Sequence, residues 1–331
     1  MNPELIVIWQ LKRISPLNRM ILCVARVLTR LIYIFFILIL FMGPRNKIML
    51  QVFLSYLLSF LISVWLFLLL KASNVTVETI APANSIWNTV YFFVVIIVET
   101  IILIILLKLF KKFNLMKGID LFISFFALFG IFSIFFEYII WPLFISFLII
   151  AIKEITKSRW LKNAIVFLVV GFFGAYIGYS LGLFPVFLLL VLIAIYDYIA
   201  VFKTKHMVFL ANQVIDKNTL FVMDYGNINT NKNAQKLTQE SKPIENKNID
   251  PSKRNHLHLG TGDFALPLMT IMSLFAMNWI FGIIAFVACL ISLELTIYLL
   301  FTKKHLALPA IPLQAIGFCI ILLIYYLCVS L

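Results

Sequence analysis

The sequence predicts an all-α membrane protein, a bundle of about nine transmembrane helices. Of its 331 residues, 63% are hydrophobic and only 12% are charged, so the chain is far more apolar than a soluble domain needs. Apolar runs of about 20 residues recur along most of the sequence, and each can cross a hydrocarbon core of ~30 Å as a helix. The runs therefore define a polytopic membrane protein.

The basic residues support this architecture because they occur in every second loop between the apolar runs. By the positive-inside rule, the basic loops are cytoplasmic and the C-terminus lies outside. The formal charge of +13 then reflects loops that face anionic lipid, and we expect no binding to nucleic acid. The predicted spans are residues 48–70, 86–107, 118–137, 138–152, 161–182, 183–202, 260–277, 278–301 and 306–330.

The chain divides into four parts. Residues 1–45 form an N-terminal extension, and residues 46–203 form six spans that include Tyr196-Asp197. Residues 204–256 form a cytoplasmic loop, and residues 257–331 form the last three spans. In the extension, the apolar run 31–43 is short and lies between Arg30 and Arg45. These flanking charges favour an interfacial or re-entrant helix over a tenth span. A start at Met49 is the other explanation of this segment.

The loop is predicted to be largely disordered, because residues 225–256 are rich in Asn and Lys and nearly free of large apolar side chains. Two shorter pieces before it have structural patterns. Residues 206–214 are typical of an amphipathic helix, and "TLFVM" at 219–223 is typical of a short strand.

Two aspartates are predicted to lie at the same depth in the membrane. Asp197, in "IAIYDYIAVFK", precedes Lys203 by six residues, which places it ~9 Å inside the cytoplasmic boundary. Asp263, in "HLGTGDFALP", follows His256 by seven residues and is ~10 Å from the same side. Because their helices run in opposite directions, the two carboxylates can meet.

Such a pair suits acid–base catalysis. Two carboxylates held together in a low-dielectric site share a proton, so one can activate water while the other polarises a peptide carbonyl. A structural alternative is that each aspartate caps a helix or pairs with a lysine or with the hydroxyl of Tyr196 or Tyr198. Two further alternatives are an ion-coupled transporter that uses Glu99 and Glu294 as well, and a catalytically silent scaffold.

Glycines before Asp263 and two prolines near the C-terminal span change the backbone at the same end of the helices. Gly260 and Gly262 allow another chain to approach Asp263 and permit an irregular helix start. In "KKHLALPAIPLQ", two closely spaced prolines at 309 and 312 leave the backbone of Ala310 and Ile311 without intrahelical partners. That backbone can receive an extended substrate, or it can be an ordinary proline-capped helix start.

Other patterns have packing explanations. The cysteines have no metal-ligand spacing, and we expect no metal or organic cofactor: Cys23, Cys289, Cys319 and Cys328. In the fifth span, small residues recur every four positions and predict close contact with another helix: Gly174, Gly178 and Gly182.

At three motifs the sequence resembles the presenilin family of intramembrane aspartyl proteases, specifically its archaeal homologues. Tyr196-Asp197 matches the YD motif of that family, Gly260-Thr261-Gly262-Asp263 matches GxGD, and Pro309-Ala310-Ile311 matches PAL. The order of the motifs, the long loop between the aspartates and the nine spans also match. Ile311 replaces the usual Leu. Signal peptide peptidases share the motifs in the opposite orientation, and the lysine pattern favours the presenilin one.

The resemblance implies a function and a site. Asp197 and Asp263 would be the catalytic pair of an endopeptidase that cuts transmembrane helices of other proteins. The implied substrate-binding residues are Tyr196, Gly260, Thr261, Gly262, Pro309, Ala310 and Ile311. The implied surroundings are the lipid bilayer, an archaeal cell membrane and an assembly of one or several copies of the chain.

Overall fold

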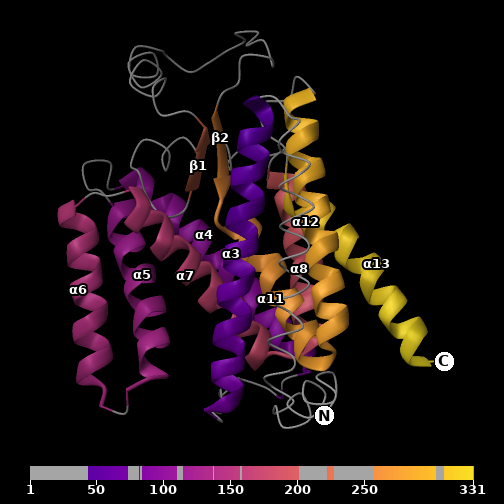
Figure 1. Ribbon diagram of the computed structural model, residues 1–331, viewed down its shortest axis with the longest axis horizontal. Coiled ribbons are helices and arrows are strands. Elements are labelled where there is room, and N and C mark those ends of the chain that lie inside the picture. The colour runs from indigo at the N-terminus through magenta and orange to yellow at the C-terminus, as the bar shows by residue number, and fades with distance from the viewer. Residues whose placement is uncertain are drawn as a thin grey trace, which may run out of the picture. The chain divides into compact units, whose positions relative to one another are not determined.

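Nine helices and two strands make up the described part of the protein (Figure 1). The computed structural model describes residues 44–73, 82, 84–109, 115–136, 138–156, 159–200, 222–226, 256–302 and 309–330. The helices are α3 (Pro44–Ala72), α4 (Ile86–Leu109), α5 (Leu115–Ser133), α6 (Ile140–Thr156), α7 (Arg159–Ser180), α8 (Leu183–Ile199), α11 (Gly262–Met277), α12 (Trp279–Thr302) and α13 (Ile311–Ser330). The strands are β1 (Val222–Gly226) and β2 (His256–Gly260).

These helices follow the predicted spans in order and confirm the all-α membrane bundle. Four are long and apolar enough to cross a membrane by themselves, over Lys47–Ala72, Leu161–Ser180, Trp279–Thr302 and Ile311–Cys328. Two of the shorter apolar helices carry the aspartates: α8 has 17 residues and α11 has 16. The chain divides into two units at residue 50, inside α3. Everything below concerns residues 51–331.

The strand predicted at 219–223 is confirmed in part by β1, which pairs with β2 as an antiparallel ribbon. The disorder predicted for 225–256 is wrong at residues 225, 226 and 256, which belong to these strands. Tyr225 pairs with Leu257, and Met223 pairs with Leu259. All four side chains are buried, because alternate residues of each strand turn to the protein. Gly260 belongs to β2, so the helix predicted at 260–277 begins two residues later, at Gly262. The predicted helix at 206–214 and the N-terminal extension up to residue 43 lie outside the described residues.

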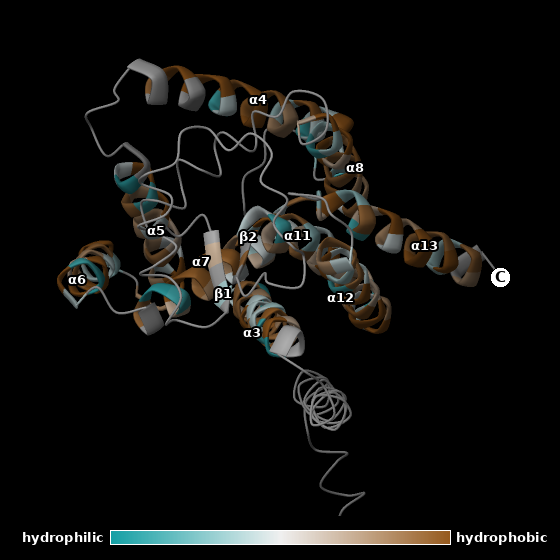
Figure 2. Ribbon diagram, turned by 90° about the horizontal axis from the view of Figure 1, so that it is seen from above, coloured by the Kyte–Doolittle hydropathy of each residue, from teal (hydrophilic) through white to brown (hydrophobic). Residues whose placement is uncertain are grey.

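Helix α11 is central, with contacts to α7, α8, α12 and α13, and Figure 2 shows it between α7 and α12. Its most extensive contact is with α7, where two glycines allow the helices to approach closely. A Cβ atom on Gly178 would lie 2.8 Å from the carbonyl oxygen of Met269, and one on Gly174 would lie 3.1 Å from the Cβ of Leu268. The predicted contact of this ridge is confirmed for Gly174 and Gly178. In lipid, such close approach of backbones supplies the packing energy between helices.

An aromatic cluster packs behind the start of α11. Tyr56 and Phe60 of α3 stack on Phe286 of α12, with ring centroids 5.3 Å and 4.1 Å away. The ring of Tyr56 also lies 5.2 Å from that of Phe264, which follows Asp263 in the chain. Phe264 and Phe60 are completely buried. These contacts fix the first turn of α11 against two other helices.

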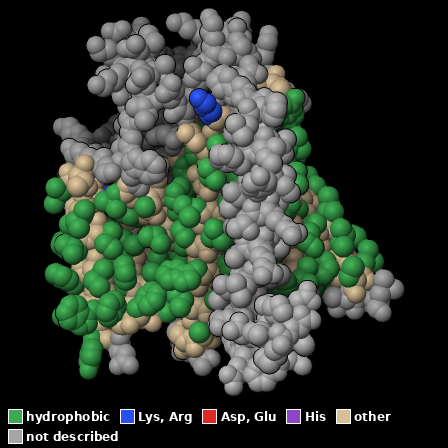
Figure 3. Space-filling model, in the orientation of Figure 1, with side chains coloured by type: hydrophobic (Ala, Val, Ile, Leu, Met, Phe, Trp, Pro, Cys, Tyr) green, Lys and Arg blue, Asp and Glu red, His purple; other side chains and the backbone are tan. Residues whose placement is uncertain are grey.

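Apolar side chains also cover much of the outer surface, as a protein surrounded by lipid requires. Figure 3 shows hydrophobic side chains over most of the described part of one face. They are most exposed on α6 and just before it, where Tyr138 is 73% exposed and Ile155 is 80% exposed. The side chains of Lys153 and Asp120 in this region are buried instead. Lys153 of α6 donates to the Asp120 carboxylate of α5 at 2.7 Å, and Lys117 pairs with Glu154.

Candidate active site

Asp197 and Asp263 come together where the end of α8 meets the start of α11. Asp197 lies in the last turn of α8, and Asp263 lies in the first turn of α11. These two helices are in contact, and the two carboxylates are close enough to interact electrostatically. Asp197 is only 4% exposed, and Asp263 is partly buried. The site therefore contains two carboxyl groups with little access to water.

The GxGD segment shapes the surroundings of Asp263. The backbone N–H of Gly260 donates to the Asp263 carboxylate, and a Cβ atom on Gly260 would lie 3.4 Å from Oδ2. The carbonyl of Thr261 caps α11 by accepting the N–H groups of Phe264, at 3.2 Å, and of Ala265, at 3.0 Å. Gly262 is exposed, and a Cβ atom there would meet nothing within 4 Å. One side of Asp263 is thus held by backbone while the other is open.

The PAL segment reaches Asp197. Pro309 and Ala310 are not helical, and α13 begins only at Ile311, five residues later than the span predicted from 306. Because the two prolines shorten the helix, the N–H of Ile311 has no intrahelical acceptor. It donates instead to the Asp197 carboxylate. Oδ2 of Asp197 has no hydrogen-bond partner within the described ranges. The irregular start of α13 therefore supplies a donor to the site.

Three other polar candidates remain: Tyr196, next to Asp197, and the two glutamates of the transporter alternative. Tyr196 hydrogen-bonds with Thr100 of α4, so it joins α8 to α4. Of the carboxylates in the transporter alternative, Glu99 is exposed on α4. Both oxygens of Glu294 are buried on α12 without a hydrogen-bond partner in the described part of the chain. Neither glutamate extends the aspartate pair into a chain of carboxylates.

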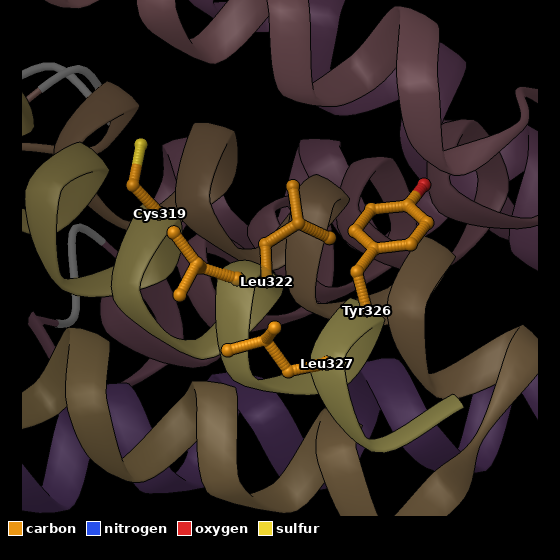
Figure 4. A pocket seen from close by; sticks show the side chains of 5 residues that line it. Cys319, Leu322, Tyr326 and Leu327 are labelled. Carbon is orange, nitrogen blue, oxygen red and sulfur yellow. The ribbon is translucent and has the colours of Figure 1, made fainter. Parts of the chain in front are cut away.

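A pocket on α13 offers no competing site. Figure 4 shows its lining, which is apolar except for one thiol and one phenol: Cys319, Leu322, Leu323, Tyr326 and Leu327. None of these residues is a carboxylate or a histidine. Within the described residues, no three His, Cys, Asp or Glu side chains gather as metal ligands. The aspartate junction is therefore the site with the clearest acid–base chemistry.

A family model for signal-peptide peptidase and presenilin aspartyl protease matches residues 52–328. The chain belongs to this family. The match covers both aspartates and all nine described helices apart from the ends of α3 and α13. As a member, the protein is an aspartic endopeptidase of the membrane, and nothing in the comparisons favours the transporter.

Solved structures agree with this membership. Two crystal forms of a presenilin family intramembrane aspartate protease, in space groups C222 and P2, superpose with TM-scores of 0.54 and 0.55 at 20% sequence identity. They cover 82% and 83% of this chain, and 98% and 97% of the solved chains. At this identity the likeness concerns the fold. A comparison with functionally curated proteins finds no match.

One residue contacts this presenilin-type site without having been predicted from the sequence. The side chain of Gln314 on α13 donates through Nε2 to the backbone oxygen of Asp263 at 3.1 Å. Two features of the sequence together indicate such a contact. Pro267, four residues after Asp263, leaves that oxygen without its helical donor, and Gln314 follows Ile311 by one turn.

Substituting Ile311→Pro tests the backbone contact to Asp197. Proline is tolerated at the first position of a helix, so α13 remains able to form, but the substitution deletes the N–H that Asp197 accepts. We expect cleavage activity to fall by roughly 10- to 100-fold, because this N–H orients the Asp197 carboxylate and a small misplacement of a catalytic group has an effect of that size. The matched control is Ile311→Leu, which keeps the N–H and should retain activity within about threefold. Equal activity in both variants would show that this donor is dispensable.

Proposed function

We propose that Asp197 and Asp263 are the catalytic pair with which this protease hydrolyses peptide bonds in the transmembrane helices of other proteins. The observation that supports the proposal most strongly is the meeting of two carboxylates from α8 and α11 in one largely buried site. In their shared-proton state, one carboxylate takes a proton from water while the other donates a hydrogen bond to the scissile carbonyl.

The bond changes follow from that proton arrangement. The water oxygen bonds to the carbonyl carbon, and the carbonyl oxygen takes up the proton of the acidic aspartate. When the tetrahedral intermediate collapses, the C–N bond breaks and the leaving nitrogen receives the proton that the basic aspartate took from water. One hydroxyl of the intermediate returns its proton to the other aspartate as the C=O bond of the new carboxyl group re-forms. The pair ends with one proton, as it began. No metal or organic cofactor is needed for this sequence of steps.

We also propose where the substrate lies. Gly260 and Thr261 lead up to Asp263, Gly262 lies on its open side, and Pro309, Ala310 and Ile311 flank Asp197. An unwound substrate segment between these two stretches of backbone would bring its scissile bond to both carboxylates. The β1–β2 ribbon ends directly before Thr261, and its edge provides further backbone partners for an extended segment. Tyr196 is proposed to line the α4 side of this path, next to Thr100.

The topology of the chain is a separate proposal. The alternating lysines support cytoplasmic basic loops and a C-terminus outside, the presenilin orientation. A membrane-impermeant reagent applied to intact cells should modify a tag at the C-terminus, whereas a tag in the 227–255 loop should react only after lysis. The reverse pattern would assign the signal-peptide-peptidase orientation. An archaeal membrane and a homo-oligomer are proposed from the resemblance to archaeal presenilin homologues.

The proposed activity is tested with purified protein in detergent and a fluorescent peptide that contains one transmembrane segment. Mass spectrometry of the products should place the cut inside the apolar segment. Cuts restricted to the flanking polar residues would contradict intramembrane cleavage. If a correctly folded protein leaves several such peptides intact, the proposal of a self-sufficient protease fails.

A further inference from the structure

The backbone of Asp263 lacks one of its regular helix contacts. In an α-helix, the carbonyl of each residue accepts the N–H of the residue four positions later. For Asp263 that residue is Pro267, which has no N–H and lies inside α11. A carbonyl in this position must find another donor, because a buried backbone oxygen without a hydrogen bond is costly.

Gln314 supplies that donor from another helix. Its side chain is completely buried, and its Nε2 lies 3.1 Å from the Asp263 oxygen. Two contacts of its own backbone hold Gln314 in place. Its N–H donates to Ala310 at 3.5 Å, and its carbonyl lies 3.8 Å from the Sγ atom of Cys289 on α12. The amide therefore projects from a fixed backbone and replaces the missing helical hydrogen bond.

The same turn of α13 also contacts the second aspartate. Ile311, three residues before Gln314, donates its N–H to the Asp197 carboxylate. Residues three apart lie on one face of a helix, so this face touches α8 through Ile311 and α11 through Gln314. The separation of the two aspartates is thus fixed by a single turn of a third helix.

We propose that Gln314 is a positioning residue of the protease: it holds the backbone of Asp263 in register with Asp197 by replacing the hydrogen bond that Pro267 removes. The proposal rests on Asp197 and Asp263 being the catalytic pair. Gln314 does not need to touch the substrate for this role. Its effect should appear in the chemical step, because a small displacement of a catalytic group lowers the rate far more than it changes ground-state binding.

The test is a double-mutant cycle between Gln314 and Pro267. Gln314→Leu keeps the approximate volume of the side chain and removes the amide. Pro267→Ala restores an N–H four residues after Asp263, so the carbonyl regains a donor from its own helix. The control is Phe318→Leu, another completely buried residue one turn further along α13. It changes the packing of α13 without affecting the Asp263 carbonyl.

Each variant is assayed for kcat, KM and the thermal unfolding midpoint in detergent. Gln314→Leu should lower kcat by roughly 10- to 100-fold while KM stays within about twofold. The double variant Gln314→Leu/Pro267→Ala should have a kcat within about threefold of the Pro267→Ala single variant. Pro267→Ala should also raise the unfolding midpoint more in the Gln314→Leu background than in the wild-type background. Adding it to Phe318→Leu should restore neither quantity.

Two results would overturn the proposal. One is a Gln314→Leu protein with wild-type kcat. The other is a loss of kcat that Pro267→Ala restores equally in the Phe318→Leu background, which would indicate general stabilisation of α11. Failure of the catalytic assignment has a different signature, because the Asp263→Asn variant would then still cleave. The unfolding midpoints test the contact between Gln314 and Asp263 in either case.

Discussion

Replacing either Asp197 or Asp263 with asparagine is expected to lower peptide cleavage by about 10⁴-fold or more, as the loss of an essential catalytic group does elsewhere. Asparagine keeps the shape of the side chain and its hydrogen bonds to the N–H groups of Ile311 and Gly260. It cannot exchange a proton with water or with the substrate. In the proposed mechanism the two groups share one proton, so the loss of either one disables both.

The matched control is Asp120→Asn, a buried aspartate of α5 that is 3% exposed and pairs with Lys153. Like the two active-site variants, it replaces a buried carboxylate in the membrane region. It should lower the amount of folded protein and leave the cleavage rate per folded molecule within about threefold of wild type. The measurement is the initial rate on the fluorescent transmembrane peptide, normalised to monodisperse protein. A residual rate above about 1% in Asp263→Asn would be incompatible with a two-aspartate mechanism.

The site is assembled from three segments that are distant in the sequence. Asp197 ends α8, Asp263 starts α11 and Ile311 starts α13. Both aspartates accept a backbone N–H at the end of an element, from Gly260 at the end of β2 and from Ile311 at the start of α13. The N–H of Ile311 is available because the first residues of a helix have no intrahelical acceptor. The ends of these elements are therefore the part of the fold that shapes the site.

The sequence predicted the parts of this arrangement that depend on local patterns. Apolar run length predicted the nine helices, and residue counts from the nearest basic side chain placed Asp197 and Asp263 at one depth. The prolines at 309 and 312 predicted a helix boundary, and α13 begins between them, at Ile311. Each of these signals depends on neighbours within about one helix length, so no knowledge of the packing was needed.

Contacts between distant segments were not predictable in the same way. The strand predicted at 219–223 overlaps β1, but its partner β2 was missed, because Tyr225 and His256 are strand residues only through a pairing across a long polar loop. Gln314 gave no periodic signal, since a single amide in an apolar helix acquires its role only from the Asp263 carbonyl that Pro267 leaves without a helical donor. The ion pair of Asp120 and Lys153 gave no local signal either, since the two residues are 33 positions apart in the chain.

That buried ion pair gives the largest expected change in stability, through Lys153→Met. The side chains of Lys153 and Asp120 are only 8% and 4% exposed, and their charged atoms are 2.7 Å apart. Methionine matches the stem of lysine but leaves the Asp120 carboxylate buried without this cation, which should lower the free energy of unfolding by about 3 to 5 kcal/mol.

The double variant Asp120→Leu/Lys153→Met removes both charges and should recover most of that loss, because replacing a buried ion pair with apolar groups is often neutral. Denaturant unfolding in detergent measures both variants. Since α6 packs on α5, and α5 in turn packs on α7, the pair lies outside the aspartate junction, and folded molecules should keep their cleavage rate. If the single and double variants were equally destabilised, packing of the two side chains would hold α5 and α6 together, and their charges would contribute little.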